Sequence, residues 1–297
     1  MLLDDECRKN RKLVGHNMCV ESDAVKEMNM NLDFYARVGD ALYEIDPKIK
    51  CDKVDLLYDE LMAGKITPYQ DEDVVEIMPA GRPNKPELVS PNAVPSRGVG
   101  SKEGVITLAH AICHIEFNAI NLGLDAAFRF RNMPAQYYAD WLLVAKDEAK
   151  HFRMLSDFLE SRGSHYGAFV AHNGLWLSAE KTAHDPLIRM ALVPRVLEAR
   201  GLDVTPGIIQ RLKQAKEDEI VGLLGIILEE EEGHVLVGNH WYRYLCEKQN
   251  LPPKETFFNL LEEYGQTLRP PFNIEARLRS GFTQEEIDYL VESIDLK

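Results

Sequence analysis

The sequence lacks the features that mark secreted, membrane-spanning or zinc-ribbon proteins. Its five cysteines, Cys7, Cys19, Cys51, Cys113 and Cys246, are odd in number, lie far apart and form no Cys-x-x-Cys pair. This spacing argues against a disulfide framework and a zinc ribbon, and predicts reduced thiols. No run of about 18 apolar residues is present, and the acidic start MLLDDECRKN lacks the basic and apolar segments of a signal peptide. We therefore expect a cytoplasmic protein with no membrane-spanning helix.

Positive charge is also in short supply. The chain of 297 residues carries 34 Lys and Arg against 48 Asp and Glu, for a formal net charge of −14. Such a charge repels a phosphate backbone, so nucleic acid is an unlikely partner. No glycine-rich nucleotide-binding loop is present, so a redox enzyme of this sequence would need an electron-donor protein. The hydrophobic share of 45% is ordinary for a globular chain long enough to bury a sizeable core.

The alternation typical of β-strands is almost absent, and helical periods dominate. Residues 1–66 are polar, with two weak helical patterns, and predict an N-terminal helical extension. Residues 67–103 contain six of the fifteen prolines and predict an extended connector. We expect a helical bundle at 104–250 and a C-terminal wrap of short helices at 251–297, where Thr283-x-x-Glu286 forms a capping box.

Four long helices are predicted within the bundle region. Their expected bounds are about 101–122, 134–161, 186–199 with Gly201 as a stop, and 217–248. A longer crossing, near 162–174, separates the second helix from the third. Short links and one longer crossing are typical of a four-helix bundle, so the predicted fold class is all-α.

Two Glu-x-x-His pairs, Glu148/His151 and Glu231/His234, carry the first chemical signal. Residues three apart share a helix face, so each pair can offer a carboxylate and an imidazole to one ion. With nine His and 28 Glu in the chain, about one such pair arises by chance. The pairs alone therefore indicate little.

Their positions along the chain are more informative. Glu116 and Glu198 each stand in an otherwise apolar helical stripe, and they precede Glu148 and Glu231 by 32 and 33 residues. In di-metal carboxylate bundles two helices give one Glu each and two give Glu-x-x-His, all projecting inward. The predicted ligands for two metal ions are accordingly Glu116, Glu148, His151, Glu198, Glu231 and His234. Mixed carboxylate and imidazole ligation favours iron, or manganese or a mixed pair, over tetrahedral zinc.

Several longer stretches resemble a known family. They include GRPNKPELVSP, AHAICHIEFNAI, DWLLVAKDEAKHF, RMALVPRVLEARGLDVTPG and EEEEGHVLVGNHWYRYLC. Residues 80 to about 285 are similar to a bacterial ferritin-like family catalogued as a domain of unknown function. The resemblance implies a di-iron carboxylate bundle with the six ligands named above, and brings no substrate. More distant similarities are to ferritin-like hydroxylases that modify tRNA and to rubrerythrin-type proteins.

Three functions remain open from the sequence. The first is a di-iron oxidoreductase that uses dioxygen or peroxide to oxidise a small organic substrate, as a monomer or homodimer. The second is iron handling, meaning ferroxidase activity or storage. The third is a non-catalytic bundle, with or without a structural metal, that docks a partner.

Two further pairs of residues could be read as functional. His110 and His114 stand one turn apart, but off the Glu116 stripe, so a role behind the ligands is more plausible than ligation. Arg195 and Arg200 flank Glu198 and could orient it or bind an anionic substrate. We expect surface ion pairs for both.

Overall fold

The computed structural model describes residues 33–71, 76, 78–94 and 98–295. Most of the predicted N-terminal extension, with Cys7 and Cys19, lies outside the described residues. Within them the secondary structure is helical, with one isolated bridge and no β-strand. The prediction of an all-α helical bundle is confirmed.

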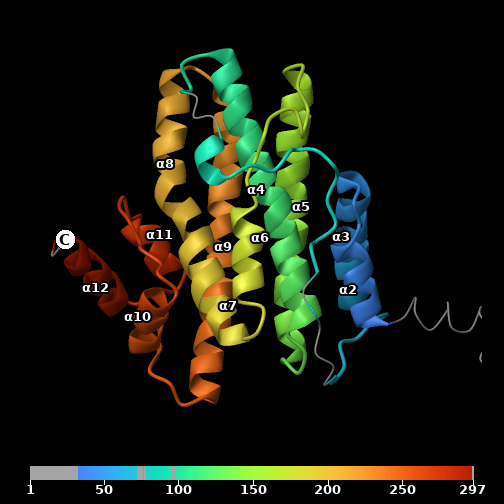
Figure 1. The fold of residues 1–297 in the computed structure, drawn as a ribbon, viewed down its shortest axis with the longest axis vertical. Helices are drawn as coiled ribbons and strands as arrows, with labels where there is room; N and C mark the ends of the chain where they lie inside the picture. The colour runs from blue at the N-terminus through green and yellow to red at the C-terminus, as the bar shows by residue number, and fades with distance from the viewer. Residues whose placement is uncertain (1–32, 72–75, 77, 95–97, 296–297) are drawn as a thin grey trace, which may run out of the picture.

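Four long helical segments make up the bundle (Figure 1). They are α4 (Lys102–Arg129), α5 (Ala135–Ser161), the continuous segment α7 (Pro186–Leu192), η2 (Val193–Glu198) and α8 (Ala199–Gln214), and α9 (Asp218–Lys248). The link between α4 and α5 and that between α8 and α9 are short, so the helices of each pair run antiparallel and pack together. α5 also packs on α9, which joins the two pairs into one bundle.

Shorter helices cover the bundle on two sides. α2 (Phe34–Leu42) and α3 (Pro47–Met62) pack on α4 and α5, and α6 (Gly174–Lys181) packs on α4. α10 (Pro253–Glu263), α11 (Ile274–Arg279) and α12 (Gln284–Asp295) lie on the opposite side of the bundle in Figure 1. Buried hydrophobic side chains from all these layers, from Phe34 to Leu290, form one continuous core.

The described part of the proline-rich connector lies on the surface of the bundle. Its one helix, η1 (Pro91–Ala93), is a single turn. Two backbone hydrogen bonds fix the connector to the crossing between α5 and α6. Val89 donates to the carbonyl of Ala171 at 2.8 Å, and Ala171 donates to that of Glu87 at 3.0 Å. The connector is therefore part of the packed structure.

Helix α4 is the core helix of the bundle. By length and composition it is the one helix of the described residues that could cross a membrane, but 67% of its apolar window is buried inside the protein. Core helices of soluble proteins share this property. Ser101 caps its first turn by accepting a hydrogen bond from the amide of Gly104 at 3.1 Å.

Two predicted helix ends are wrong. The first long helix continues two turns beyond residue 122, because Asp125 inside the last turns is buried and paired with Arg129 and Arg189. Gly201 does not stop the third helix, which continues to Gln214 even though Pro206 lies inside it. Pro206 cannot donate to the carbonyl of Leu202, and the side chain of Asn273 donates to that carbonyl instead, at 3.2 Å.

The expectation of a surface ion pair at Arg195 is also wrong. Its side chain is fully buried, donates to Asn239 and Glu286, and lies among the rings of Tyr242, Phe257 and Phe282. α10 and α12 therefore cover the Arg195 side chain, whereas the helix pattern around it predicts that it is exposed to solvent. Glu286 also closes the predicted capping box, since its carboxylate accepts from the amide of Thr283 at 2.9 Å.

Gly238 of α9 allows this helix to pack closely against the π-helical turn η2. A Cβ on Gly238 of α9 would lie 2.3 Å from the side chain of Pro194, in the π-helical turn that ends at Glu198. Gly222, on an exposed part of the same helix, would meet nothing within 4 Å. Close packing at Gly238 therefore sets the position of the turn that carries Glu198.

We expect Gly238→Ala to lower the free energy of unfolding by about 1–3 kcal/mol, because the added methyl group overlaps Pro194. Gly222→Ala should raise it by about 0.5–1 kcal/mol, because alanine favours the helix and the site is open. Urea denaturation of both variants measures the difference. Equal stability of the two variants would contradict this account of the Gly238 contact.

Candidate metal centre

The six predicted ligands all lie at the middle of the four long helices. Glu116 comes from α4, Glu148 and His151 from α5, Glu198 from the end of the π-helical turn, and Glu231 and His234 from α9. Glu148 and His151 are fully buried, and Glu116 and His234 are each 3% exposed. Charged side chains this deep in a core need a partner, because removing an unpaired charge from water is costly.

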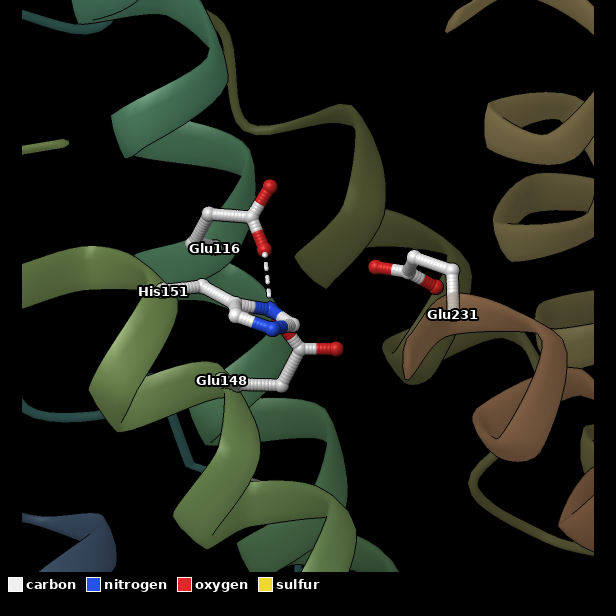
Figure 2. A group of neighbouring side chains, drawn as sticks. All are labelled: Glu116, Glu148, His151 and Glu231. Carbon is white, nitrogen blue, oxygen red and sulfur yellow. Dashed lines mark hydrogen bonds and ion pairs between the residues drawn. The ribbon is translucent and has the colours of Figure 1, made fainter. Parts of the chain in front are cut away.

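Four of these residues form a compact group. One ligand atom from each of Glu116, Glu148, His151 and Glu231 lies within 4.8 Å of every other. Figure 2 shows Glu116, Glu148 and His151 converging from α4 and α5 while Glu231 faces them from α9. The Nδ1 atom of His151 lies 3.4 Å from an oxygen of Glu116 and 3.4 Å from an oxygen of Glu148. This group could hold a metal ion.

Glu148 is the residue shared by the two histidines. Its Oε2 faces His151, and its Oε1 lies 2.9 Å from Nδ1 of His234. The same Nδ1 is 3.7 Å from an oxygen of Glu231. His234 therefore adjoins the compact group through Glu148, with the centroid of its ring 5.9 Å from that of His151.

Glu198 is buried next to the group but is not one of its four members. Its Oε2 is buried and has no hydrogen-bond partner. Burial and the charges of Glu231 and Glu148 raise the pKa of its carboxyl to about 8. A π-helical turn places it there, and such turns are frequent at functional sites.

Two carboxylates that the sequence interpretation missed lie behind the histidines. Glu230 of α9 is 2.7 Å from Nε2 of His151 on α5, and Asp147 of α5 is 3.4 Å from Nε2 of His234 on α9. Each acid immediately precedes the Glu of one Glu-x-x-His pair and contacts the histidine of the other. The acid before each pair is the sequence signal that could have found them. Such carboxylates orient a metal-binding imidazole and increase its basicity.

The site contains a concentration of polar atoms without hydrogen bonds. The buried atoms that lack one are Oε2 of Glu116, Oε2 of Glu198 and Oε2 of Glu231, together with Oε1 of Glu148 and Nδ1 of His234, which form an ion pair at 2.9 Å but no hydrogen bond. Native proteins rarely leave such atoms unpaired, and an absent ion is one standard reason when they do. All five atoms are of kinds that ligate metals, so the residues fit a bound metal.

Protons balance the charge where no metal is bound. Burial and the charge of Glu148 raise the pKa of Glu116 well above its usual range. Burial alone would lower the pKa of His151, but Glu116 and Glu148 raise it to about 11. Burial would raise the pKa of Glu148, yet His234 and His151 hold it well below its usual range. Metal binding must therefore displace protons from this site.

His110 and His114 are not part of the group. His110 accepts a hydrogen bond from the amide of Gly167 at 2.9 Å, and His114 contacts the hydroxyl of Tyr166 at 2.9 Å and the carbonyl of His172 at 3.2 Å. They attach α4 to the crossing between α5 and α6. The three described cysteines, Cys51, Cys113 and Cys246, are free thiols and are buried.

We expect the contribution of Glu198 and His151 to the stability of metal-free protein to fall as pH rises from about 5 to 8. The pKa of Glu198 is about 8 in the folded state, above its value of about 4.3 in an unfolded chain, so the folded state keeps a proton that the unfolded state releases. His151 acts in the same direction above about pH 6.5, because the unfolded chain releases the imidazole proton there while the folded state keeps it. Urea denaturation across this range measures the slope.

Glu198→Gln should flatten this slope, and the matched control Glu229→Gln, at an exposed position on α9, should leave it unchanged. An identical slope in the Glu198→Gln variant would show that this carboxyl does not carry the pH dependence.

Glu230→Gln and Asp147→Asn should each weaken metal binding by about 10- to 100-fold, because each removes the acceptor behind one imidazole. Competition with a chromophoric chelator measures the affinity, and Glu229→Gln again serves as the control. Wild-type affinity in both variants would exclude a supporting role for these two acids.

Comparison with known proteins places the chain in a family. A protein of Haemophilus influenzae strain Rd, described as "Uncharacterized protein", is 46% identical over 271 residues, which cover 87% of this chain and 94% of that protein. No solved structure is a significant match. The family described as "Protein of unknown function (DUF455)" matches residues 43–288, a range that contains all four long helices and all six predicted ligands. The chain therefore belongs to the DUF455 family.

Proposed function

We propose that the protein is a non-haem di-iron oxidoreductase with a ferritin-like bundle, in which Glu116, Glu148, His151, Glu198, Glu231 and His234 hold two metal ions. The observation that carries the proposal is the group of buried carboxylates around Glu148, which has two adjacent imidazoles and several oxygens without a hydrogen bond. Four carboxylates match the charge of two divalent cations, which would replace the protons that balance the site otherwise.

The arrangement supports two ions better than one. Glu148 presents one oxygen toward each histidine, which suits a carboxylate that bridges two metals. Glu116 lies on the His151 side of Glu148, whereas Glu231 lies within reach of His234. The raised pKa of Glu198 does not argue against metal ligation, because a nearby cation would lower this pKa and ionise the carboxyl.

Iron is the metal that best fits this ligand set and an oxidative role. Carboxylate and imidazole ligands suit iron or manganese, and a bound iron pair would supply electrons to dioxygen or peroxide for the oxidation of a small organic substrate. The protein would hold the ligands in place and keep water away from the buried site. An electron-donor protein would restore the reduced state.

The experiment is to load the protein with Fe²⁺ under argon, measure bound iron, and then admit air. We expect about two iron ions per chain, as in other di-metal carboxylate bundles, and their oxidation much faster than that of free Fe²⁺ in the same buffer. Glu148→Gln should fail to retain the pair, because it removes the shared carboxylate. Glu229→Gln should behave as the wild type.

Two outcomes would contradict the proposal. Less than one metal ion per chain, with stability unchanged by Glu148→Gln, would favour a bundle that works by docking a partner. Assembly into a large closed shell with continued uptake of iron, seen by gel filtration, would favour storage.

A further inference from the structure

A small, partly open cavity lies on the side of α4 that faces α6 and the connector. Its volume is about 40 Å³, and none of the six predicted metal ligands lines it. Its polar lining consists of His114, Asn118 and Asn121 of α4, Asn173 and Trp176 at the start of α6, and Arg82 of the connector. Such a volume accommodates roughly two to four water molecules or one ligand of a few non-hydrogen atoms.

Trp176 provides a hydrogen-bond donor that the protein leaves unused. The residue is only 3% exposed, and its indole Nε1 is buried without a hydrogen-bond partner. Buried indole N–H groups normally find an acceptor. Since Trp176 lines the cavity, a ligand there that carries an acceptor oxygen can satisfy it.

Lys50 brings a positive charge to the back of the cavity. Its side chain is fully buried, and its Nζ donates to Oδ1 of Asn121 at 2.5 Å and to the carbonyl of Leu42 at 2.7 Å. Among the described residues no carboxylate lies within ion-pair distance of this Nζ. Because Oδ1 of Asn121 accepts from Lys50, the Nδ2 group of Asn121 is the part of this amide that can donate to a ligand in the cavity.

The other walls favour the same sign of ligand charge. Asn173, the residue before α6, makes no side-chain cap, and the positive end of the helix lies beside the cavity, where the amide of Gly174 donates to Nδ1 of His172 at 3.1 Å. Arg82 is exposed and adds a cation near the cavity. None of the lining residues is acidic. Burial lowers the pKa of Lys50 to about 7, and an anion in the cavity would oppose this loss of charge.

We propose that this cavity is a binding site for a small carboxylate anion, which accepts hydrogen bonds from Nε1 of Trp176 and Nδ2 of Asn121 and is held by the charge of Lys50. The site is distinct from the metal centre and goes beyond the proposed oxidoreductase function. It needs no metal to form.

Acetate is the probe, and the indole N–H signals of the full-length chain are the readout. The sequence has three tryptophans, so a ¹⁵N–¹H spectrum contains three indole signals, and Trp176→Phe identifies the one from Trp176. Zn²⁺, a diamagnetic ion, is added in place of iron so that the indole signals are not broadened by a paramagnetic metal. We expect a saturable shift of the Trp176 signal with acetate, and none with chloride at equal ionic strength.

The other two tryptophans are internal controls. Nε1 of Trp141 is also buried and unpartnered, but Trp141 does not line the cavity, and Nε1 of Trp241 already donates to Asp140 at 2.9 Å. Neither signal should shift. Asn121→Leu and Lys50→Met should each weaken acetate binding about tenfold or more, whereas Asn84→Ala, at an exposed position on the connector, should not.

The wild-type titration alone decides the proposal if a variant fails to fold. No saturable shift would mean that water fills the cavity, and would overturn it. The same would follow from an equal shift with chloride, or from parallel shifts of all three indole signals.

Discussion

The centre of this structure depends on one constraint, which is that the negative charge of the buried Glu148 carboxylate must be balanced. It is fully buried between His151 and His234, and each imidazole has a second acid, Glu230 or Asp147, on its far side. Every element of the bundle core contributes to this arrangement. α4 and the π-helical turn add further carboxylates, and the close approach of α9 at Gly238 sets the position of that turn. The bundle is therefore a scaffold that holds carboxylates and imidazoles of opposite charge close together in its core.

This charge arrangement explains why a metal and protons are alternatives at the same site. Without a cation, burial and mutual repulsion keep carboxyls such as Glu116 and Glu198 protonated, while the histidines are positively charged. With cations bound, the protons would leave and the same oxygens would become ligands. The packed surroundings exclude water, which makes either form of compensation necessary rather than optional.

Much of the fold and the candidate site follows from residue spacing. The apolar stripes around Glu116 and Glu198 predict that these carboxylates face inward, because helical periodicity is a local property. In the folded protein both carboxylates lie beside residues of the Glu-x-x-His pairs. What escaped prediction depends on contacts between distant segments. Pro206 is tolerated because Asn273 satisfies the freed carbonyl, and Arg195 is buried because Glu286 and three aromatic rings from the C-terminal half surround it. The pairing of Glu230 with His151 likewise requires knowing that α9 faces α5.

The most direct test of the central claim is a crystal structure of iron-loaded protein with anomalous diffraction measured at the iron absorption edge. We expect two peaks, one near Glu116 and His151 and one near Glu231 and His234, with Glu148 between them. The proposed di-iron centre would be contradicted by the absence of a peak among these residues in iron-replete crystals, or by iron bound elsewhere while Glu148 keeps only its two histidines.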